Sequence, residues 1–169
     1  MGKRSNFERR PRDFYPTPKE AALVLEPYIG TALFYEPCVG DGDLVRHLED
    51  MGSVCMGSSD HEIDATTADY SNMADHECFI TNPPWDRKIL HPLIENLSKQ
   101  APTWLLFDAD WMHTIQAAPY MRLCRAIVSV GRVKWIPDSK MTGKDNCCWY
   151  LFDDTGGVYS DGRPVFHGR

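Results

Sequence analysis

The residues with the clearest chemical potential form the segment Asn82-Pro83-Pro84-Trp85, which directly follows an apolar run at 78–81 that predicts a buried strand. Two consecutive prolines remove two backbone N–H donors and fix the chain. Carbonyl oxygens and the Asn82 amide oxygen remain as hydrogen-bond acceptors, and Trp85 adds a flat aromatic surface. These groups suit a planar amino group, because two acceptors take its two protons while the indole stacks on its plane.

A second candidate site is the turn Glu36-Pro37-Cys38-Val39-Gly40-Asp41-Gly42, between a predicted strand at 32–36 and a predicted helix that begins at Asp43. Glycines allow a ligand to approach the backbone closely, and ligands of such sheets bind at the carboxyl ends of strands. Val45 stands where the dinucleotide-binding fingerprint has its third glycine, and the acidic side chains would repel phosphate. The turn therefore favours a cationic ligand or one rich in hydroxyl and amino donors; the alternative is a plain strand–helix turn.

Further carboxylates follow the second predicted strand, at 53–58. Asp60 comes just after this strand, where an acid is placed to bind ribose hydroxyls. Asp69 and Tyr70 suit the amino group and the ring of an adenine, and Asp64 competes with Asp69 for that role. The alternative for each residue is a solvated side chain in a polar loop.

Taken together, these motifs resemble those of S-adenosylmethionine-dependent methyltransferases. The segment Asn82–Trp85 resembles the catalytic tetrapeptide of enzymes that methylate adenine N6 or cytosine N4, and Glu36-Pro37-x-x-Gly40-x-Gly42 resembles their cofactor motif. Phe14-Tyr15-Pro16-Thr17-Pro18 resembles the amino-terminal cofactor motif that precedes it in one large subgroup. The likeness spans residues 13–110 and is to small bacteriophage-type DNA adenine-N6 methyltransferases.

The resemblance implies methyl transfer from S-adenosylmethionine to the N6 amine of adenine in DNA, without a metal ion. It implies that a target base inside a duplex is flipped out, with Trp85 replacing the lost stacking. The implied catalytic residues are Asn82, Pro83, Pro84 and Trp85. The implied cofactor-binding residues are Tyr15, Thr17, Pro18, Glu36, Pro37, Cys38, Gly40, Gly42, Asp60, Asp69 and Tyr70, of which the first three would line the methionine end.

The elements needed to position these residues alternate between strands and helices, which predicts an α/β fold. Apolar patterns predict strands at 32–36, 53–58, 78–81, 103–107, 126–130, 133–136 and 147–152, and helices from Thr17 to about Gly30, from Asp43 to Gly52, at 89–97 and within 115–124. The last three strands lack intervening helices and predict an antiparallel hairpin. The resemblance implies a Rossmann-like methyltransferase fold with a mostly parallel seven-stranded sheet.

Length and charge limit the remaining possibilities. The 169 residues predict one domain at 13–153, with a flexible arm at 1–12 and an irregular tail at 154–169. The net charge is −6, but the arm holds five basic residues against Glu8. An acidic body argues against broad nucleic-acid binding, while the arm is either a phosphate-contacting segment or a solubilising terminus.

Several absences in the sequence exclude other classes of protein. No apolar run is long enough to span a bilayer and no secretory signal is present, so we expect a cytoplasmic protein without a membrane partner. The six cysteines include no C-x-x-C pair and predict reduced, buried thiols, with no structural metal site.

The substrate is less specified than the chemistry. Residues 108–169 are too few for a separate target-recognition region, which leaves short recognition, loose recognition or a specificity partner open. The basic residues of the last third are the candidates for phosphate contact: Arg122, Arg125, Arg132, Lys134, Lys140 and Lys144. With Trp135, the stretch 132–144 is a candidate substrate surface, and the alternative is an ordinary hairpin with solvated lysines. RNA, a protein glutamine amide, and a non-catalytic cofactor- or nucleic-acid-binding module remain alternatives, and the oligomeric state is not predicted.

Overall fold

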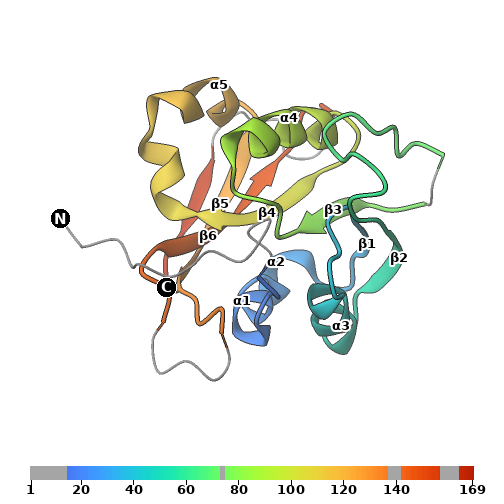
Figure 1. Ribbon diagram of the computed structural model, residues 1–169, viewed down its shortest axis with the longest axis horizontal. Helices are drawn as coiled ribbons and strands as arrows, with labels where there is room; N and C mark the ends of the chain where they lie inside the picture. The colour runs from blue at the N-terminus through green and yellow to red at the C-terminus, as the bar shows by residue number, and fades with distance from the viewer. Residues whose placement is uncertain (1–14, 73–74, 137–141, 157–163) are drawn as a thin grey trace.

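The computed structural model describes residues 15–72, 75–136, 142–156 and 164–169, and the basic arm at 1–12 lies outside them. The described residues form one seven-stranded sheet in the order β2-β1-β3-β4-β6-β5-β7 (Figure 1). The strands are β1 (Leu33–Glu36), β2 (Val54–Ser58), β3 (Cys78–Thr81), β4 (Thr103–Asp108), β5 (Cys124–Arg132), β6 (Asn146–Phe152) and β7 (Val165–His167). Only β6 is antiparallel to its neighbours, β4 and β5. The predicted α/β fold with an antiparallel C-terminal hairpin is therefore confirmed.

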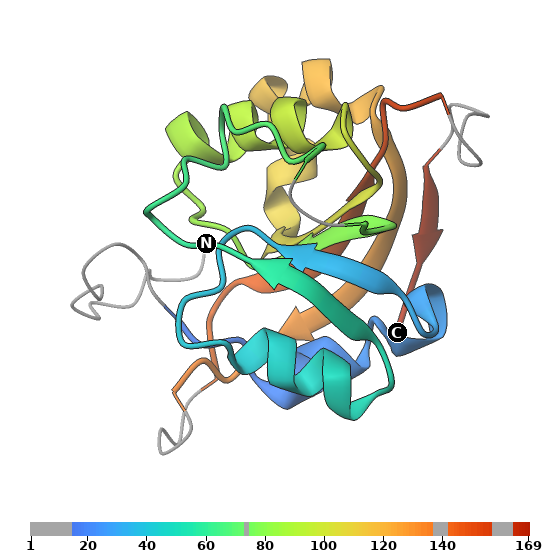
Figure 2. The same ribbon diagram turned by 90° about the vertical axis from the view of Figure 1, so that its right-hand side faces the viewer.

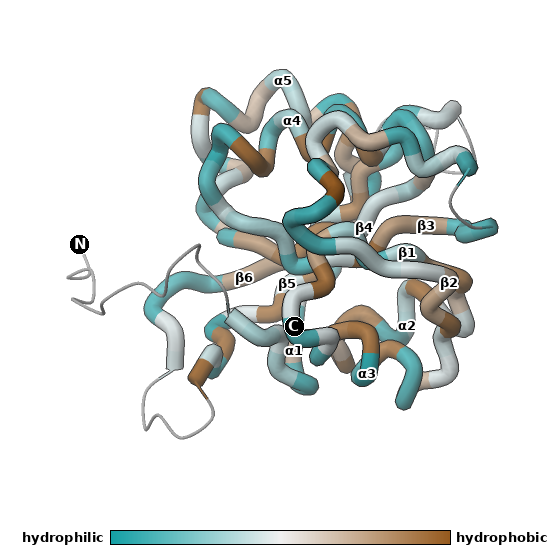
Figure 3. Tube along the Cα trace, turned by 45° about the vertical axis from the view of Figure 1, so that its right-hand side comes forward, coloured by the Kyte–Doolittle hydropathy of each residue, from teal (hydrophilic) through white to brown (hydrophobic). Residues whose placement is uncertain are grey.

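Helices cover both faces of the sheet (Figure 2). One face carries α1 (Lys19–Leu23), α2 (Glu26–Ile29) and α3 (Asp43–Asp50), and the other carries α4 (Arg87–Ser98), the 3₁₀ turns η2 (Ala109–His113) and η3 (Ile115–Ala117), and α5 (Ala118–Met121). Each layer buries its own apolar cluster against the strands, which are largely hydrophobic in Figure 3. When both faces of a parallel sheet are covered, its strands have nearly continuous apolar sequences, as β3 and β4 do here.

The strand directions gather the chemically important residues at one edge. Strands β1, β3 and β4 are parallel, and β5 shares their direction because β4 and β5 are both antiparallel to β6. The carboxyl ends of β1, β3, β4 and β5 therefore share one edge of the sheet, which we call the carboxyl edge. Glu36, Thr81, Asp108 and Arg132 are the last residues of these four strands.

The single helix predicted from Thr17 to Gly30 is wrong: the segment forms the two short helices α1 and α2. Pro27 has no N–H to continue an α-helical bond series, so it begins a second helix instead. Thr17 does not cap α1, whose N-cap residue is Pro18 and has no side-chain cap. Gly30 ends α2 with a φ of 55°, as its position predicts.

Two predictions for the last third also differ from the structure. The strand expected at 133–136 is absent; β5 instead runs to Arg132, after an irregularity in its pairing between Ser129 and Gly131, where Gly131 has a φ of 82°. The tail is not irregular throughout, because β7 pairs in parallel with β5. Three residues are too few to give a strand signal in the sequence.

The helix expected within 115–124 is reduced to η3 and the four-residue helix α5. Pro119 lies in the first turn of α5, where its missing N–H is not needed, and so it starts a new helix rather than extending η3. The loop predicted for 60–77 contains neither helix nor strand among its described residues. Within the described ranges, no helix is long and apolar enough to cross a membrane.

Candidate functional site

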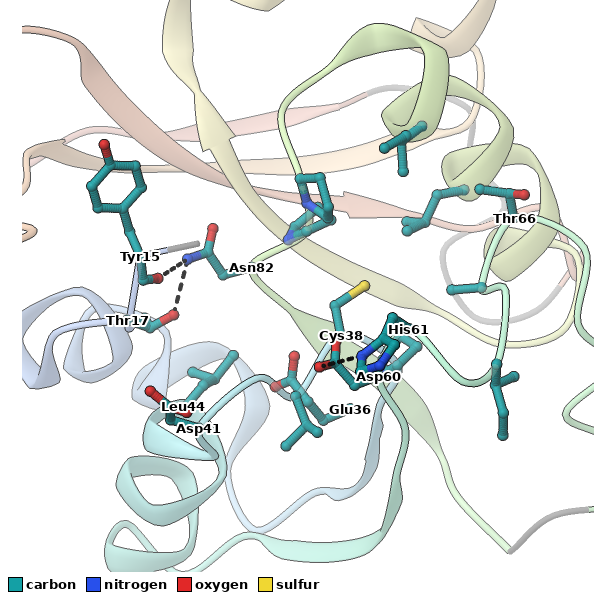
Figure 4. A pocket seen from close by; sticks show the side chains of 18 of the residues that line it. Tyr15, Thr17, Glu36, Cys38, Asp41, Leu44, Asp60, His61, Thr66 and Asn82 are labelled. Carbon is teal, nitrogen blue, oxygen red and sulfur yellow. Dashed lines mark hydrogen bonds and ion pairs between the residues drawn. The ribbon is translucent and has the colours of Figure 1, made fainter. Parts of the chain in front are cut away.

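A cavity of about 1100 Å³ opens at the carboxyl edge, where the ends of β1, β2 and β3 meet the segment 15–17 (Figure 4). Pockets of a few hundred to about 1,000 Å³ are typical of small-molecule sites. Nine residues predicted from the sequence line this cavity: Tyr15, Thr17, Glu36, Pro37, Cys38, Asp60, Asn82, Pro83 and Pro84. The structure thus brings together all three motifs.

Six predicted residues are not among the lining residues: Pro18, Gly40, Gly42, Asp69, Tyr70 and Trp85. Two of them, Gly40 and Gly42, shape the cavity wall through the backbone, with φ values of 51° and 75° that side-chain-bearing residues rarely adopt. The turn is also tied to the end of β2, because the Val39 N–H donates to the Ser59 carbonyl at 2.9 Å.

Asp64, rather than Asp69, lies at the cavity. Asp64 lines the wall, and its carboxylate accepts bonds from the N–H and the hydroxyl of Thr66, which lower its pKa. Asp69 lies outside the lining and accepts a bond from the Ser71 N–H. Tyr70 is fully buried and packs edge-on against Tyr35 in the core. Of the two acids considered in the sequence analysis, Asp64 is the one that lines the cavity.

Glu36 is the most unusual group in the cavity wall. Its side chain is only 1% exposed, and its Oε2 atom has no hydrogen-bond partner among the described residues. Burial raises its pKa from 4.5 to about 8, an effect that the Thr81 hydroxyl partly offsets. A buried carboxyl oxygen without a partner is costly, so this carboxyl is suited to a ligand that brings a donor or a positive charge.

The cavity wall is strongly acidic. Besides Glu36 it carries five aspartates: Asp41, Asp43, Asp60, Asp64 and Asp86. His61 is the single basic side chain among the described lining residues, and its Nδ1 lies 3.2 Å from Asp60. Burial raises the pKa of the Cys38 thiol to about 12, so that group stays neutral. This electrostatic environment disfavours a phosphate and favours a cation or a donor-rich ligand.

Sequence reasoning missed several lining residues: Pro16, His61, Ile63, Ala65, Thr66, Asp86, Ile89 and Leu93. Ile89 and Leu93 lie on the apolar stripe of α4, whose pattern by itself indicates only core packing. His61 and Thr66 lie in a polar loop without a motif. Asp86 caps α4, since its carboxylate accepts from the Lys88 N–H at 2.9 Å.

Two amide side chains bond to the loop from Asp60 to Tyr70: Asn96 in α4 and Gln100 just after this helix. Asn96 donates to the carbonyls of Ala65 and Ala68 at 3.0 and 2.9 Å. Gln100 donates to the same Ala68 carbonyl at 3.0 Å and accepts from the Tyr70 N–H at 2.8 Å. These bonds hold a segment without regular secondary structure in one conformation along the cavity.

The side chain of Asn82 is held at both ends. Its Nδ2 lies 3.3 Å from the Tyr15 carbonyl oxygen and 3.1 Å from the Thr17 hydroxyl oxygen, as Figure 4 shows. Its Oδ1 accepts a hydrogen bond from the Trp85 indole N–H at 3.3 Å. The segment 15–17 therefore positions the tetrapeptide that lies 65 residues later.

Trp85 also belongs to an aromatic group at the cavity mouth. Its ring contacts that of Trp135 edge-on, with centroids 5.7 Å apart, and Trp135 in turn lies 6.3 Å from the ring of Tyr15. From the sequence, Trp135 was predicted only as part of a candidate substrate surface. The irregular segment after β5 brings it to the tetrapeptide, because the chain leaves the sheet at Arg132.

The basic residues of the predicted phosphate-contacting surface separate into two groups. Arg132, Lys134 and Lys144 lie in or beside the connection from β5 to β6, at the carboxyl edge. Arg122 and Arg125 lie at or before the start of β5, at the opposite edge. Lys140 lies outside the described residues. Exposed Arg87 and Lys88, at the start of α4, add positive charge near Trp85 and were missed by the sequence analysis. The described residues contain no cluster of three or more potential metal ligands.

Comparison with known proteins places the fold. No protein-family model and no curated protein sequence matches this chain. Among solved structures, a candidate RNA methyltransferase from Pyrococcus horikoshii aligns with a TM-score of 0.56 at 13% identity, over 89% of this chain and 92% of that one. A candidate class I S-adenosylmethionine-dependent methyltransferase from Listeria monocytogenes aligns with a TM-score of 0.54 at 10% identity, over 90% of this chain and 65% of that one.

A modification subunit of a candidate type I restriction enzyme from Vibrio vulnificus aligns with a TM-score of 0.53 at 11% identity, over 92% of this chain and 47% of that one. This chain therefore spans less than half of that subunit. At these identities the likeness establishes the fold, which is the Rossmann-like class I methyltransferase fold.

Proposed function

We propose that this protein transfers a methyl group from S-adenosylmethionine to the exocyclic N6 amine of adenine in DNA. The observation that carries the proposal is the Asn82–Trp85 tetrapeptide at the carboxyl end of β3, facing a cavity whose other wall is acidic. An acceptor for an amine and a site for a cation thus lie in one cavity of the class I methyltransferase fold.

The cavity wall fits this cofactor chemically. S-adenosylmethionine carries a sulfonium and an ammonium group, ribose hydroxyls and an adenine amine, and it has no phosphate. The buried carboxyl of Glu36, whose Oε2 has no partner among the described residues, offers an acceptor, and the five aspartates add negative charge. Asp60 suits the ribose hydroxyls and Asp64 the adenine amine, while Tyr15 and Thr17 lie on the side of Asn82, where the methionine end would meet the target.

The protein's task in this reaction is alignment and charge stabilisation. S-adenosylmethionine supplies an electrophilic methyl group, so neither a metal nor a covalent enzyme intermediate is required. Asn82 Oδ1 and the Pro83 carbonyl would accept hydrogen bonds from the two N–H groups of the target amine, which favours a pyramidal nitrogen and stabilises its developing positive charge. As the nitrogen–methyl bond forms, the methyl–sulfur bond breaks, and the methylated amine then loses one proton to water. Holding the reacting atoms in line while excluding water lowers such barriers by up to about 7–11 kcal/mol.

Nucleic acid is the acceptor that the cavity mouth favours. Trp85 and Trp135 offer ring surfaces on which an unstacked base can pack, and base–aromatic contacts are worth about 1–3 kcal/mol each. Arg87, Lys88, Arg132, Lys134 and Lys144 supply positive charge around an otherwise acidic opening. DNA is proposed over RNA because the motif order resembles small bacteriophage-type DNA adenine methyltransferases, and RNA is the second candidate because one structural neighbour bears that assignment. A partner that supplies target specificity is part of the proposal, since β4 to β7 and their connections take up most of the described residues from 103 onward.

The test is to incubate the protein with S-adenosylmethionine labelled in its methyl group and, in separate reactions, duplex DNA, single-stranded DNA, RNA and protein. We expect label in DNA, recovered as N6-methyladenine by mass spectrometry after digestion. Asn82→Ala serves as the matched inactive variant: its turnover should fall by about 100-fold while cofactor binding, measured by calorimetry, persists. Label confined to RNA or to protein would refute the DNA assignment, and cofactor binding without any transfer would favour a non-catalytic module.

A further inference from the structure

The amide of Asn82 has one orientation, set by the chemistry of its neighbours. The Tyr15 carbonyl only accepts hydrogen bonds and the Trp85 indole N–H only donates them. The nitrogen of the amide must therefore face Tyr15 and Thr17, and the oxygen must face Trp85, at 3.3, 3.1 and 3.3 Å respectively. Both N–H protons of Asn82 have an acceptor, and its oxygen retains one lone pair.

We propose that Thr17 is a positioning residue for methyl transfer, whose hydroxyl holds the Asn82 amide so that the free lone pair of Oδ1 faces the target amine. This inference rests on the proposed function. It gives Thr17 a role distinct from lining the methionine end of the cofactor site, which is all that its motif implies. Thr17 is suited to that role because it is only 5% exposed, on a stiff segment between Pro16 and Pro18.

Thr17 provides the shorter of the two bonds to Nδ2, and without it the amide keeps one acceptor, the Tyr15 carbonyl. The Tyr15 carbonyl and the Trp85 indole N–H then remain as the two partners of the amide, and its terminal torsion, which is broad for asparagine, is fixed less narrowly. Bonds donated by Nδ2 also draw electron density toward Oδ1, which makes that oxygen a stronger acceptor. Thr17 therefore affects both the direction and the strength of the bond that Asn82 offers to a substrate.

The indole N–H of Trp85 completes the arrangement from the other side. It occupies one lone pair of Oδ1, so the direction of the remaining lone pair is defined. Phenylalanine at this position would keep an aromatic ring for stacking and lose the donor. Trp85→Phe thus separates the two contributions of the side chain, and it gives a second variant that acts on the same amide.

The experiment compares Thr17→Val, which removes the hydroxyl at nearly constant volume, with Thr17→Ser, which keeps it. Thr103→Val is the matched control, because Thr103 is also buried and bonded, donating to the Ala101 carbonyl at 2.8 Å, but lies at the start of β4 on the opposite edge. Each variant is measured for cofactor affinity by calorimetry, for kcat and KM with labelled cofactor and DNA, and for melting temperature.

We expect Thr17→Val to lower kcat by about 10- to 100-fold, with cofactor affinity and KM for DNA nearly unchanged, as for groups that orient a reacting side chain. Thr17→Ser should recover most of the rate and Thr103→Val should keep it. Trp85→Phe should also lower kcat, and the double variant with Thr17→Val should lose less than the product of the two single losses. Equal loss of cofactor affinity and rate in Thr17→Val would make Thr17 a cofactor ligand and overturn the inference while leaving the proposed function intact.

A second measurement separates failure of the inference from failure of the proposed function. The ¹⁵N-labelled side-chain amide of Asn82 reports its hydrogen bonds directly, in the protein alone. We expect its proton signals to move in Thr17→Val and to stay in Thr103→Val. If the wild-type protein labels no acceptor, the proposed function fails; unchanged Asn82 signals in Thr17→Val would overturn the positioning role whether or not transfer occurs.

Discussion

Gln100 and Tyr70 are joined by a hydrogen bond in which the Gln100 side-chain oxygen accepts from the Tyr70 N–H at 2.8 Å. The same side chain donates to the Ala68 carbonyl, and Asn96 adds two further bonds to this loop. Asn96 and Gln100 are not among the lining residues of the candidate cavity, yet they bond the loop that carries Asp64. The acidic wall of the cavity depends on contacts from outside it.

Gln100→Ala should therefore weaken cofactor binding without altering any cavity residue. It leaves the Tyr70 N–H without its acceptor, and an unsatisfied buried group costs about 1–3 kcal/mol of stability. At saturating cofactor the rate should recover, because Asn82 is untouched. Calorimetry and chemical denaturation measure the two effects. Gln116→Ala, at an exposed position of η3, is the control. If Gln116→Ala lowered cofactor affinity as much as Gln100→Ala does, the role of the loop contacts would be contradicted.

Glu36→Gln should change how both stability and cofactor binding depend on pH. Burial raises the Glu36 pKa to about 8 from 4.5, so between these pH values the folded protein holds a proton that the unfolded chain has lost. Raising the pH then favours unfolding, by at most about 5 kcal/mol across this range. Denaturation at pH 5, 6.5 and 8 should show a decline in the wild type that Glu36→Gln reduces.

Cofactor affinity should change with pH in the opposite direction to stability. The ionised Glu36 attracts a cation and the protonated form does not, so affinity for S-adenosylmethionine should rise as the pH approaches 8 and level off above it. Glu36→Gln should flatten this rise, and Glu49→Gln on exposed α3 should not. Affinity that falls with pH in the wild type would show that Glu36 does not face the positive groups of the cofactor.

Arg132→Gln should weaken nucleic-acid binding and make it less sensitive to salt. Each phosphate contact contributes about −0.9 to the slope of log K against log salt concentration. Arg122→Gln removes the same charge at the opposite edge of the sheet and should leave the slope unchanged. Fluorescence anisotropy with labelled DNA at several salt concentrations distinguishes the two variants, and equal slopes for both would remove the carboxyl edge from the interface.

Trp135→Ala should lower affinity for single-stranded DNA by about 1–3 kcal/mol, the value of one base–aromatic contact. Trp135 contacts Trp85 and the lining residue Tyr15 but is not itself among the lining residues, so cofactor affinity should persist. Trp135→Phe keeps a flat ring and should retain most of the binding. Undiminished DNA affinity in the alanine variant would mean that the aromatic group serves packing alone.

The sequence predicted the parts of the site that local chemistry determines. Glu36 ends β1, Asp60 lies just beyond β2 and Asn82 directly follows β3, and parallel strands bring such residues to one edge. Short motifs with unusual composition were sufficient, because prolines and glycines restrict the backbone independently of tertiary contacts. The cavity itself was therefore predictable, although its volume was not.

What could not be predicted depends on contacts between distant segments. The bond from Asn82 to Thr17 links residues 65 apart, and a threonine before a proline signals a helix cap equally well. Trp135 reaches Trp85 only because β5 ends at Arg132 after an irregular pairing, whereas its local pattern favoured a further strand. Asp64 and Asp69 lie in the same polar loop without a local signal that separates them, and the amides of Asn96 and Gln100 bond this loop from a distant segment.

The position of β6 in the sheet has a consequence for the order in which the chain assembles. Strand β6 lies between β4 and β5, although it follows both in the sequence. During synthesis, the edges of β4 and β5 that pair with β6 therefore have no partner until residues 146–152 emerge. Strand β7 pairs with β5 and so follows only after β5 is in place. Strands β1 to β3 pair only with one another and with β4, all of which precede β6 in the sequence. An interrupted translation product ending before Asn146 would expose the apolar edges of β4 and β5, which makes it a substrate for chaperones and a source of aggregation.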